Sequence, residues 1–247
     1  MTEIRLIVLD IDGVVTSGEA QPLDLKLLAR LGAMNQAART DPKRPSVTFC
    51  TGRPAPYLEV MLQAIDGNLP GVYENGAGIY DPADYQFLPL PEIEQYLNGF
   101  AEITSRIEET LVQDKIVYFQ PGKHHSLTIF PIDPTRIQEL KGLATEALGP
   151  LSEQVDLVYS TSCLNVLPRG VDKGKGIEFL AHQVEISPAN MLGVGDSDVD
   201  LPFLKLVGHS AAPSNGNSSV KEIVEYVAEE PTSEGVREIL THFKLIK

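Results

Sequence analysis

Short runs of apolar residues alternate with longer segments of helical periodicity along the first third of the chain. The apolar runs fall in "IRLIVLD", "SVTFCT" and "GVYENG", and the helical patterns fall at residues 22–39 and in "PYLEVMLQAI". A strand made only of apolar residues is buried on both faces, which is typical of a parallel sheet between two layers of helices. This part of the chain therefore predicts alternating strands and helices of the α/β class.

The same alternation returns in the last third of the chain. We expect a helix near residues 174–182, a strand in "NMLGVGD", a helix near residues 200–206, a strand in "GHSAA" and a helix at residues 219–226. Together the two segments predict one doubly wound parallel sheet with helices on both faces. Because ligands of such sheets bind at the carboxyl ends of the strands, the residues after each apolar run are the first candidates for a site.

The middle of the chain has a different pattern. Predicted helices at residues 92–113 and 134–148 are each followed by two strand candidates, "DKIVYF" and "SLTIFPI" after the first and "VDLVYS" and "CLNVLP" after the second. Repeated helix-strand-strand units with turn signals such as "QPGK" predict an antiparallel sheet with helices on one face. We therefore expect a core domain formed by residues 1–80 and 168–247, with an α+β domain inserted at residues 81–167.

Composition mainly excludes classes of partner. The chain has 247 residues, 43% of them hydrophobic, which is enough for a core with an insert. Its formal net charge of −14 argues against a nucleic-acid partner. No apolar run approaches the roughly 18 residues of a membrane helix, and the N-terminus lacks the pattern of a signal peptide. We expect a cytoplasmic protein without a membrane partner, and the sequence leaves the oligomeric state open.

Carboxylates follow two of the predicted strands. Asp10 and Asp12 end "LIVLDID", and Asp196 and Asp200 lie in "GVGDSDVD". If the sheet forms as predicted, these strand ends converge on one rim, although they lie almost the whole chain apart. Crowded carboxylates raise one another's pKa unless a cation neutralises them, and oxygen ligands of this kind suit Mg²⁺. The sequence therefore predicts a Mg²⁺ site among these carboxylates.

The segments "DIDGVVT", "TGR", the lysine of "VDKGKG" and "GDSDVD", in this order, resemble the four motifs of the haloacid dehalogenase superfamily of phosphatases. The resemblance covers both core segments, and the insert resembles the C2-type cap of that superfamily, subtype C2B. "YENGAGIYD" and "APSNGNSSVKEIVEYV" are similar to the sugar-phosphate, phosphoglycolate and sucrose-phosphate phosphatases of this branch. The resemblance implies a Mg²⁺-dependent phosphatase that hydrolyses a small phosphorylated metabolite through an aspartyl-phosphate.

The resemblance also implies catalytic roles. Asp10 would be the nucleophile, and Asp12 would be the general acid and base. Thr51 and the amide of Gly52, near a helix N-terminus, would bind the phosphate oxygens. Lys173 would neutralise charge on the transferring phosphoryl group and orient Asp10.

The same resemblance implies a set of metal ligands. Mg²⁺ would be held by Asp10, Asp196 and the backbone carbonyl of Asp12, and Asp200 would support these ligands. The chain departs from the pattern at Val199, because this branch commonly has an asparagine there, which a valine cannot replace as a hydrogen-bonding group.

Substrate specificity is expected from residues near the rim and in the insert. Arg53 and Asn75 lie near the ends of core strands and are expected to contact the substrate. Lys115 and Asn165 lie in predicted strands whose alternation could turn them towards the core. Residues 123–125 are near a turn that could reach an anionic leaving group, although a solvated hairpin tip is the favoured interpretation.

Two other functions stay open from the sequence. A phosphotransferase or phosphomutase of the same superfamily would pass the phosphoryl group to a sugar hydroxyl instead of water. A receiver-like binding module would also combine Asp, Thr and Lys with Mg²⁺ on a doubly wound sheet, but it is shorter and needs neither the second Asp nor the cap.

Overall fold

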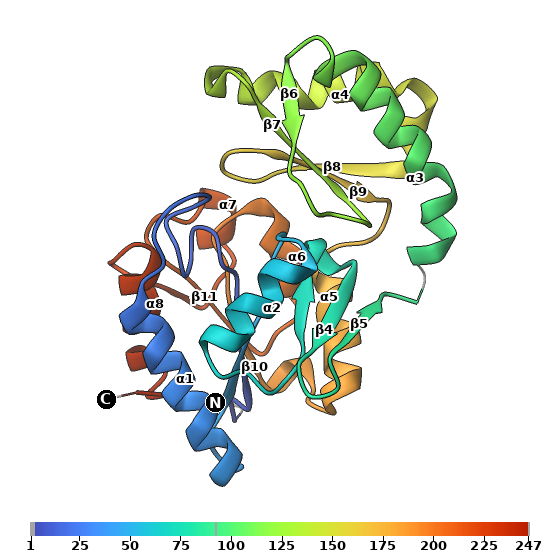
Figure 1. The fold of residues 1–247 in the computed structure, drawn as a ribbon. Coiled ribbons are helices and arrows are strands. Elements are labelled where there is room, and N and C mark those ends of the chain that lie inside the picture. The colour runs from blue at the N-terminus through green and yellow to red at the C-terminus, as the bar shows by residue number, and fades with distance from the viewer. Residues whose placement is uncertain (1–2, 92, 247) are drawn as a thin grey trace.

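The computed structural model describes residues 3–91 and 93–246, without the side chains of residues 96–98. A parallel sheet between helices forms the core, and a smaller antiparallel sheet with its own helices lies above it (Figure 1). We call this second unit, which contains β6 to β9, α3 and α4, the cap.

Five parallel strands form the central sheet of the core, in the order β12-β11-β10-β1-β2. Their bounds are Leu6–Leu9 (β1), Ser46–Phe49 (β2), Met191–Val194 (β10), His209–Ala212 (β11) and Tyr226–Val227 (β12). β1 pairs in parallel with β10 on one side and with β2 on the other. The residues that follow these three strands therefore emerge at the same edge of the sheet.

Alternate residues of β1 pack on opposite faces of this sheet. Ile7 and Leu9 join one hydrophobic cluster, and Leu6 and Val8 join another. The first cluster includes residues of α1 (Leu25–Thr40), α2 (Ala55–Ala64) and α8 (Thr232–His242), and the second includes residues of α5 (Lys173–Val184), α6 (Leu201–Leu204) and α7 (Ser218–Lys221). Helices on both faces confirm the predicted doubly wound sheet.

A three-stranded antiparallel sheet extends the core beside β2. It consists of β3 (Gly71–Tyr73), β4 (Gly78–Asp81) and β5 (Gln86–Pro89), and a single bridge between Cys50 and Val72 joins it to the central sheet. Between β3 and β4 the chain makes a 3₁₀ turn at Glu74–Gly76. Glu74 and Asn75 both have left-handed backbone conformations, with φ of 47° and 57°. This turn aims two consecutive polar side chains away from the sheet, where the cap lies.

The cap has a four-stranded antiparallel sheet in the order β6-β7-β9-β8. Its strands are Val117–Phe119 (β6), Leu127–Pro131 (β7), Val155–Tyr159 (β8) and Leu164–Pro168 (β9), and its helices are α3 (Ile93–Ile107), which continues as a π-helical turn at Glu108–Val112, and α4 (Leu140–Leu148). The helices pack on one face, where Ile129, Leu164 and Val166 are buried. In Figure 1 the opposite face looks towards the core.

Some of the sequence predictions need correction. The helix expected at residues 219–226 ends at Lys221, because Tyr226 and Val227 instead pair with β11 as the edge strand β12. Neither β5 nor α8 is among the predicted elements. β5 pairs with β4 of the core. The division of the chain into a core of residues 1–80 and 168–247 and an insert of residues 81–167 stays a prediction.

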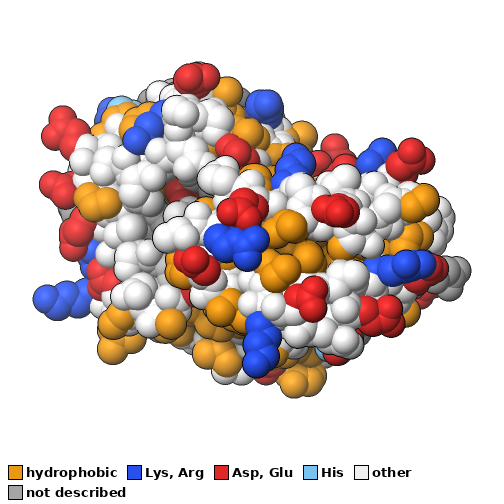
Figure 2. All heavy atoms as spheres, turned by 90° about the horizontal axis from the view of Figure 1, so that it is seen from above, with side chains coloured by type: hydrophobic (Ala, Val, Ile, Leu, Met, Phe, Trp, Pro, Cys, Tyr) orange, Lys and Arg blue, Asp and Glu red, His pale blue; other side chains and the backbone are white. Residues whose placement is uncertain are grey.

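Charges of both signs are mixed on the face of the molecule seen from above (Figure 2). Figure 2, a view from above, shows Lys and Arg side chains next to Asp and Glu side chains, without a continuous band of one sign on that face. Among the helices in the described part of the chain, none combines the length and the apolar character that crossing a bilayer requires.

Candidate active site

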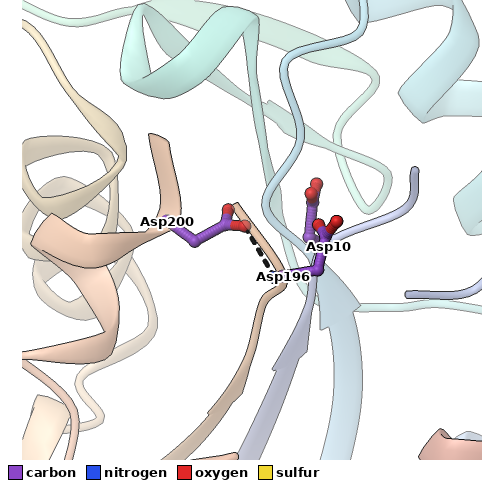
Figure 3. A group of neighbouring side chains, drawn as sticks. All are labelled: Asp10, Asp196 and Asp200. Carbon is purple, nitrogen blue, oxygen red and sulfur yellow. Dashed lines mark hydrogen bonds between the residues drawn. The ribbon is translucent and has the colours of Figure 1, made fainter. Parts of the chain in front are cut away.

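Three carboxylates meet at the carboxyl ends of β1 and β10. Asp10 directly follows β1, Asp196 follows β10 after one glycine, and Asp200 lies in the short 3₁₀ turn Asp198–Asp200. One carboxylate oxygen of each residue lies within 4.8 Å of the others, and all three residues are buried. Figure 3 shows the carboxylates of Asp10 and Asp196 side by side, with Asp200 reaching towards them from the neighbouring segment. The structure thus brings together carboxylates that lie 190 residues apart in the sequence, as the sheet topology predicted.

Donors from the protein occupy both oxygens of Asp200. Its Oδ2 accepts the N–H groups of Asp196 at 2.9 Å and Ser197 at 3.0 Å, and its Oδ1 lies 2.5 Å from Lys173 Nζ. The same ammonium lies 2.8 Å from Asp10 Oδ1. Burial alone would lower the pKa of Lys173, but the charges of Asp10 and Asp200 raise it above its ordinary value. Lys173 therefore stays charged and joins the two carboxylates.

Asp10 and Asp196 have the properties of cation ligands. Asp196 Oδ1 is buried and has no hydrogen-bond partner among the described residues. Burial, together with the charges of Asp200 and Asp10, raises the pKa of Asp196 to about 9. Burial raises the pKa of Asp10 to about 7, although Lys173 opposes this shift. Since a divalent cation would relieve this crowding and prefers carboxylate oxygens, these residues fit Mg²⁺.

A glycine allows the loop after β1 to pass close to this acidic group. Gly13 has φ of +85°, and a Cβ atom there would lie 2.2 Å from Asp196 Oδ2. A side chain at this position would therefore fill the space beside the carboxylate.

Asp12 forms an ion pair that the sequence did not predict. Arg53 Nε lies 2.6 Å from Asp12 Oδ2, and Arg53 Nη2 lies 2.7 Å from Asp12 Oδ1. The guanidinium also lies over the ring of Tyr57, 4.8 Å from its centroid. This two-point contact fixes the plane of the Asp12 carboxylate. Contact of Arg53 with the substrate stays a prediction.

The segment that contains Thr51 and Gly52 is packed against the turn that carries Asn75. Thr51 is fully buried, its hydroxyl accepts the Arg53 N–H at 3.1 Å, and its carbonyl accepts the Asn75 N–H at 3.0 Å. A Cβ atom on Gly52 would lie 3.0 Å from Asn75 Oδ1. This Oδ1 is buried and has no hydrogen-bond partner among the described residues, while Asn75 Nδ2 donates to Asn165 Oδ1 in the cap at 3.2 Å.

A cavity of about 30 Å³ lies where these residues meet the cap. Asp10, Asp12, Gly52, Arg53 and Lys173 line it from the core. The cap contributes polar side chains, which are Gln120, Thr128, Ser160 and Asn165. Because this volume is roughly that of one water molecule, the core and cap are closed on each other.

The contact between core and cap corrects two predictions. Glu74, which is 1% exposed, accepts the N–H groups of His124, His125 and Ser126 at 2.9 to 3.0 Å. The solvated hairpin tip expected at residues 123–125 is therefore wrong for the backbone of this loop, which is held against the core, although the His124 side chain is exposed. Lys115 is exposed and sits in a left-handed turn before β6, with φ of 56°, so it does not turn towards the core from a strand.

Comparison with known proteins places this site in a family. Residues 123–240 match the family model of haloacid dehalogenase-like hydrolases. The chain is 32% identical over 247 residues to a phosphoglycolate phosphatase of Archaeoglobus fulgidus, and the match covers 100% of both chains. The chain belongs to the haloacid dehalogenase-like hydrolase family. A phosphoglycolate phosphatase of Methanopyrus kandleri is 27% identical over 237 residues, which cover 95% of each chain.

Solved structures share the fold of this family member. A protein of Thermoplasma acidophilum has a TM-score of 0.71 at 20% identity, with 98% of this chain and 99% of the other covered. The sucrose-phosphatase of Synechocystis, solved with sucrose and phosphate, has a TM-score of 0.69 at 17% identity, with 99% of both chains covered. The relatives and the family make this haloacid dehalogenase-like hydrolase a phosphatase. This decides against the non-enzymatic receiver-like module.

Sequence reasoning missed several residues that lie at the site of this hydrolase. Thr128 follows Leu127 and precedes Ile129 in β7, so a polar residue between apolar ones was a signal that it lies on the other face of the sheet. Glu19 accepts a hydrogen bond from Ser162 Oγ at 2.9 Å and lines the cavity, but no pattern in the sequence connects these two loops. Val199, the departure from the family motif, also lines the cavity and is 8% exposed.

Proposed function

We propose that the protein is a Mg²⁺-dependent phosphatase that hydrolyses a small phosphorylated metabolite through an aspartyl-phosphate on Asp10. The observation that carries this proposal is the environment of Asp10. Its carboxylate lies 2.8 Å from a buried ammonium and beside the unpartnered oxygen of Asp196. A nucleophile, a positive charge for the phosphoryl group and a cation ligand thus meet at one point.

Mg²⁺ would be held by Asp10, Asp196 and the backbone carbonyl of Asp12, and when bound it would neutralise negative charge on the transferring phosphoryl group. Asp10 attacks phosphorus with a carboxylate oxygen, and the bond from phosphorus to the leaving oxygen breaks. The ammonium of Lys173 favours the ionised form of Asp10 against the effect of burial, and it balances charge on the phosphoryl oxygens.

Thr51 and Gly52 bind the remaining phosphate oxygens in this proposal. They follow β2 and precede α2, so a phosphate there would lie before a helix N-terminus, where the macrodipole favours an anion. Asp200 acts on the reaction only indirectly, because its oxygens are occupied by Lys173 and by the N–H groups of Asp196 and Ser197.

Asp12 transfers protons in both halves of the reaction. It gives a proton to the leaving oxygen in the first half. In the second half it takes a proton from the water that attacks phosphorus, and the bond between Asp10 and phosphorus breaks. Because each carboxylate oxygen has a second acceptor site, Asp12 can exchange a proton with the substrate while Arg53 fixes the plane of the carboxylate. Arg53 thereby positions the acid and base before the substrate binds.

The closed cavity of about 30 Å³ has no room for a phosphate with its leaving group, so the cap has to move away from the core to admit a substrate. The curated relatives that match the whole chain are named phosphoglycolate phosphatase, which supports a leaving group of a few atoms.

The test is the release of inorganic phosphate from a panel of phosphorylated metabolites, with Mg²⁺ and with a chelator. The panel includes 2-phosphoglycolate, phosphoglycerates, hexose phosphates and sucrose phosphate. We expect Mg²⁺-dependent release that is fastest for the small acids. Loss of this activity in Asp196→Asn, but not in Asp198→Asn, would assign the cation to Asp196. Lack of release from every compound, or equal rates with the chelator, would contradict the proposal.

A further inference from the structure

Lys123 lies on the cap loop that Glu74 holds against the core. Its Nζ donates a hydrogen bond to Thr128 Oγ1, which in turn donates to Asn165 Oδ1 at 2.8 Å. The same Asn165 oxygen accepts the bond from Asn75 Nδ2 of the core. Thr128, Asn165 and Asn75 all line the closed cavity. The Lys123 ammonium is therefore one hydroxyl group away from the space beside the catalytic aspartates.

This ammonium lacks an acidic partner. Within the described residues, no carboxylate oxygen lies within the 4.0 Å of an ion pair with Lys123. Glu74 is the acid that acts on it most strongly, but both Glu74 oxygens already accept backbone N–H groups of the loop. Burial lowers the pKa of Lys123 to about 8, against the charge of Glu74, so the side chain is still mainly charged at neutral pH. Lys123 is half-buried, so its charge is only partly hydrated, and an anion from the substrate would stabilise it.

The other cations around the cavity are already paired. Arg53 contacts Asp12, and Lys173 contacts Asp10 and Asp200. The positive charge of Lys123 is therefore available to bind an anionic group of the substrate. It also lies on the cap, opposite the core residues to which the phosphate is assigned.

We propose that Lys123, with the N–H donors that the Thr128 hydroxyl does not accept, binds an anionic group on the leaving group and so determines specificity. The inference rests on the proposed function. The class of substrate is a phosphate monoester of a short acid, in which a carboxylate lies a few bonds from the phosphate. A neutral alcohol of the same size would leave the Lys123 ammonium without a counterion, so the enzyme would discriminate against it.

The experiment compares two substrates that differ only in charge, 2-phosphoglycolate and its amide, carbamoylmethyl phosphate. We measure kcat/KM for both in the parent enzyme and in Lys123→Met, Lys123→Arg and Lys115→Met. The ratio of acid to amide should fall about 10- to 100-fold in Lys123→Met, mainly through KM for the acid, because one charge-assisted contact is lost. Lys123→Arg should keep part of the ratio. Lys115→Met, an exposed lysine outside the site, should keep all of it.

Several results would overturn the role of Lys123. An unchanged ratio in Lys123→Met, or an equal loss for both substrates in a protein with parental thermal stability, would do so. If Lys123→Met does not fold, Lys123→Arg decides. A ratio of acid to amide that is reduced but still favours the acid supports the role of Lys123, and a ratio equal to that of the parent contradicts it. Hydrolysis of an aryl phosphate and of the amide, but not of the acid, would also reject Lys123 while leaving the proposed phosphatase intact. Absence of hydrolysis for all three compounds with Mg²⁺ would reject the proposed function itself.

Discussion

Arg53 holds both carboxylate oxygens of Asp12, with its Nε 2.6 Å from Oδ2 and its Nη2 2.7 Å from Oδ1. The two residues come from loops 41 positions apart, one after β1 and one after β2. Because these strands are parallel neighbours, their ends bring the two side chains to the same edge of the sheet. The pair therefore connects the proposed acid and base to the phosphate-binding segment.

The first prediction concerns this pair. Arg53→Met should lower kcat about 10- to 100-fold, because Asp12 loses its fixed orientation, while Asp12→Ala should lower it about 10²- to 10⁴-fold. If Arg53 acts through Asp12, the double mutant should be little slower than Asp12→Ala alone, as a double-mutant cycle on kcat can show. Arg169→Met, at an exposed ion pair with Asp156, is the control. Additive losses would instead assign Arg53 a separate contact with the substrate.

The contact between Glu74 and the cap loop predicts a change in dynamics. In Glu74→Gln the side chain loses its charge and one acceptor oxygen, so the N–H groups of residues 124–126 are held less strongly. We expect these amides to exchange with deuterium about 10-fold faster or more, while the strands of the central sheet keep their protection. Glu109→Gln, whose partner Ser105 is exposed, should change neither. Unchanged exchange at residues 124–126 would mean that Glu74 does not hold the loop closed.

Substitution of Gly76 should destabilise the protein, whereas substitution of Gly142 should not. It has φ of +103°, and a Cβ atom there would lie 1.9 Å from the carbonyl oxygen of Asp172, the N-cap of α5. Gly76→Ala should therefore destabilise the protein by about 2 to 5 kcal/mol through backbone strain and overpacking. In Gly142→Ala the new Cβ meets no atom within 4 Å inside α4, so stability should stay equal or rise by up to about 1 kcal/mol. Denaturant unfolding of both variants is the measurement, and equal midpoints would contradict the predicted clash.

Asp24 predicts a dependence of stability on pH. Its carboxylate caps α1 by accepting the N–H groups of Lys26 and Leu27, and it lies 2.7 Å from Arg237 Nη2. Burial opposes these contacts, but they lower the pKa of Asp24 to about 2. The folded state thus gains stability, about 1 kcal/mol after solvent screening, that is present above pH 4 and is lost as the pH falls towards 2.

The matched substitution is Asp24→Asn, which keeps a capping oxygen but removes the charge. At pH 7 we expect its free energy of unfolding to lie about 1 kcal/mol below that of the parent, and at pH 3 the difference should shrink. Asp84→Asn, at an exposed position, should match the parent at both pH values. If the difference in the free energy of unfolding between parent and Asp24→Asn instead grows as the pH falls, the pKa of Asp24 is not lowered in the folded state.

The sequence predicted those parts of the site that depend on strand order. Asp10 and Asp196 follow apolar runs, and in a parallel sheet such positions share an edge whatever the length of chain between them. Contacts between loops carry no such pattern. The pair of Arg53 with Asp12 depends on side-chain rotamers, and the contact of Glu74 with residues 124–126 depends on two successive left-handed residues in a turn.

Local patterns also failed where pairing at the sheet edge outweighed helical periodicity. The segment that ends at Tyr226 has a helical pattern, but Tyr226 and the following Val227 pair with β11 as an edge strand. Lys115 was assigned to a strand by the alternation of its neighbours, although the chain there is still turning out of the π-helical segment. In both places the outcome depends on partners distant in the sequence, which a local window does not contain.

The central claim is that Asp10 becomes phosphorylated. The most direct measurement mixes the enzyme rapidly with Mg²⁺ and a phosphorylated substrate, quenches the reaction in acid, and locates covalent phosphate by mass spectrometry of peptides. We predict phosphate on the peptide that contains Asp10 in the parent enzyme, none in Asp10→Asn, and slowed formation and decay in Asp12→Ala. Covalent phosphate in Asp10→Asn, or phosphate on a different residue of the parent enzyme, would contradict the account.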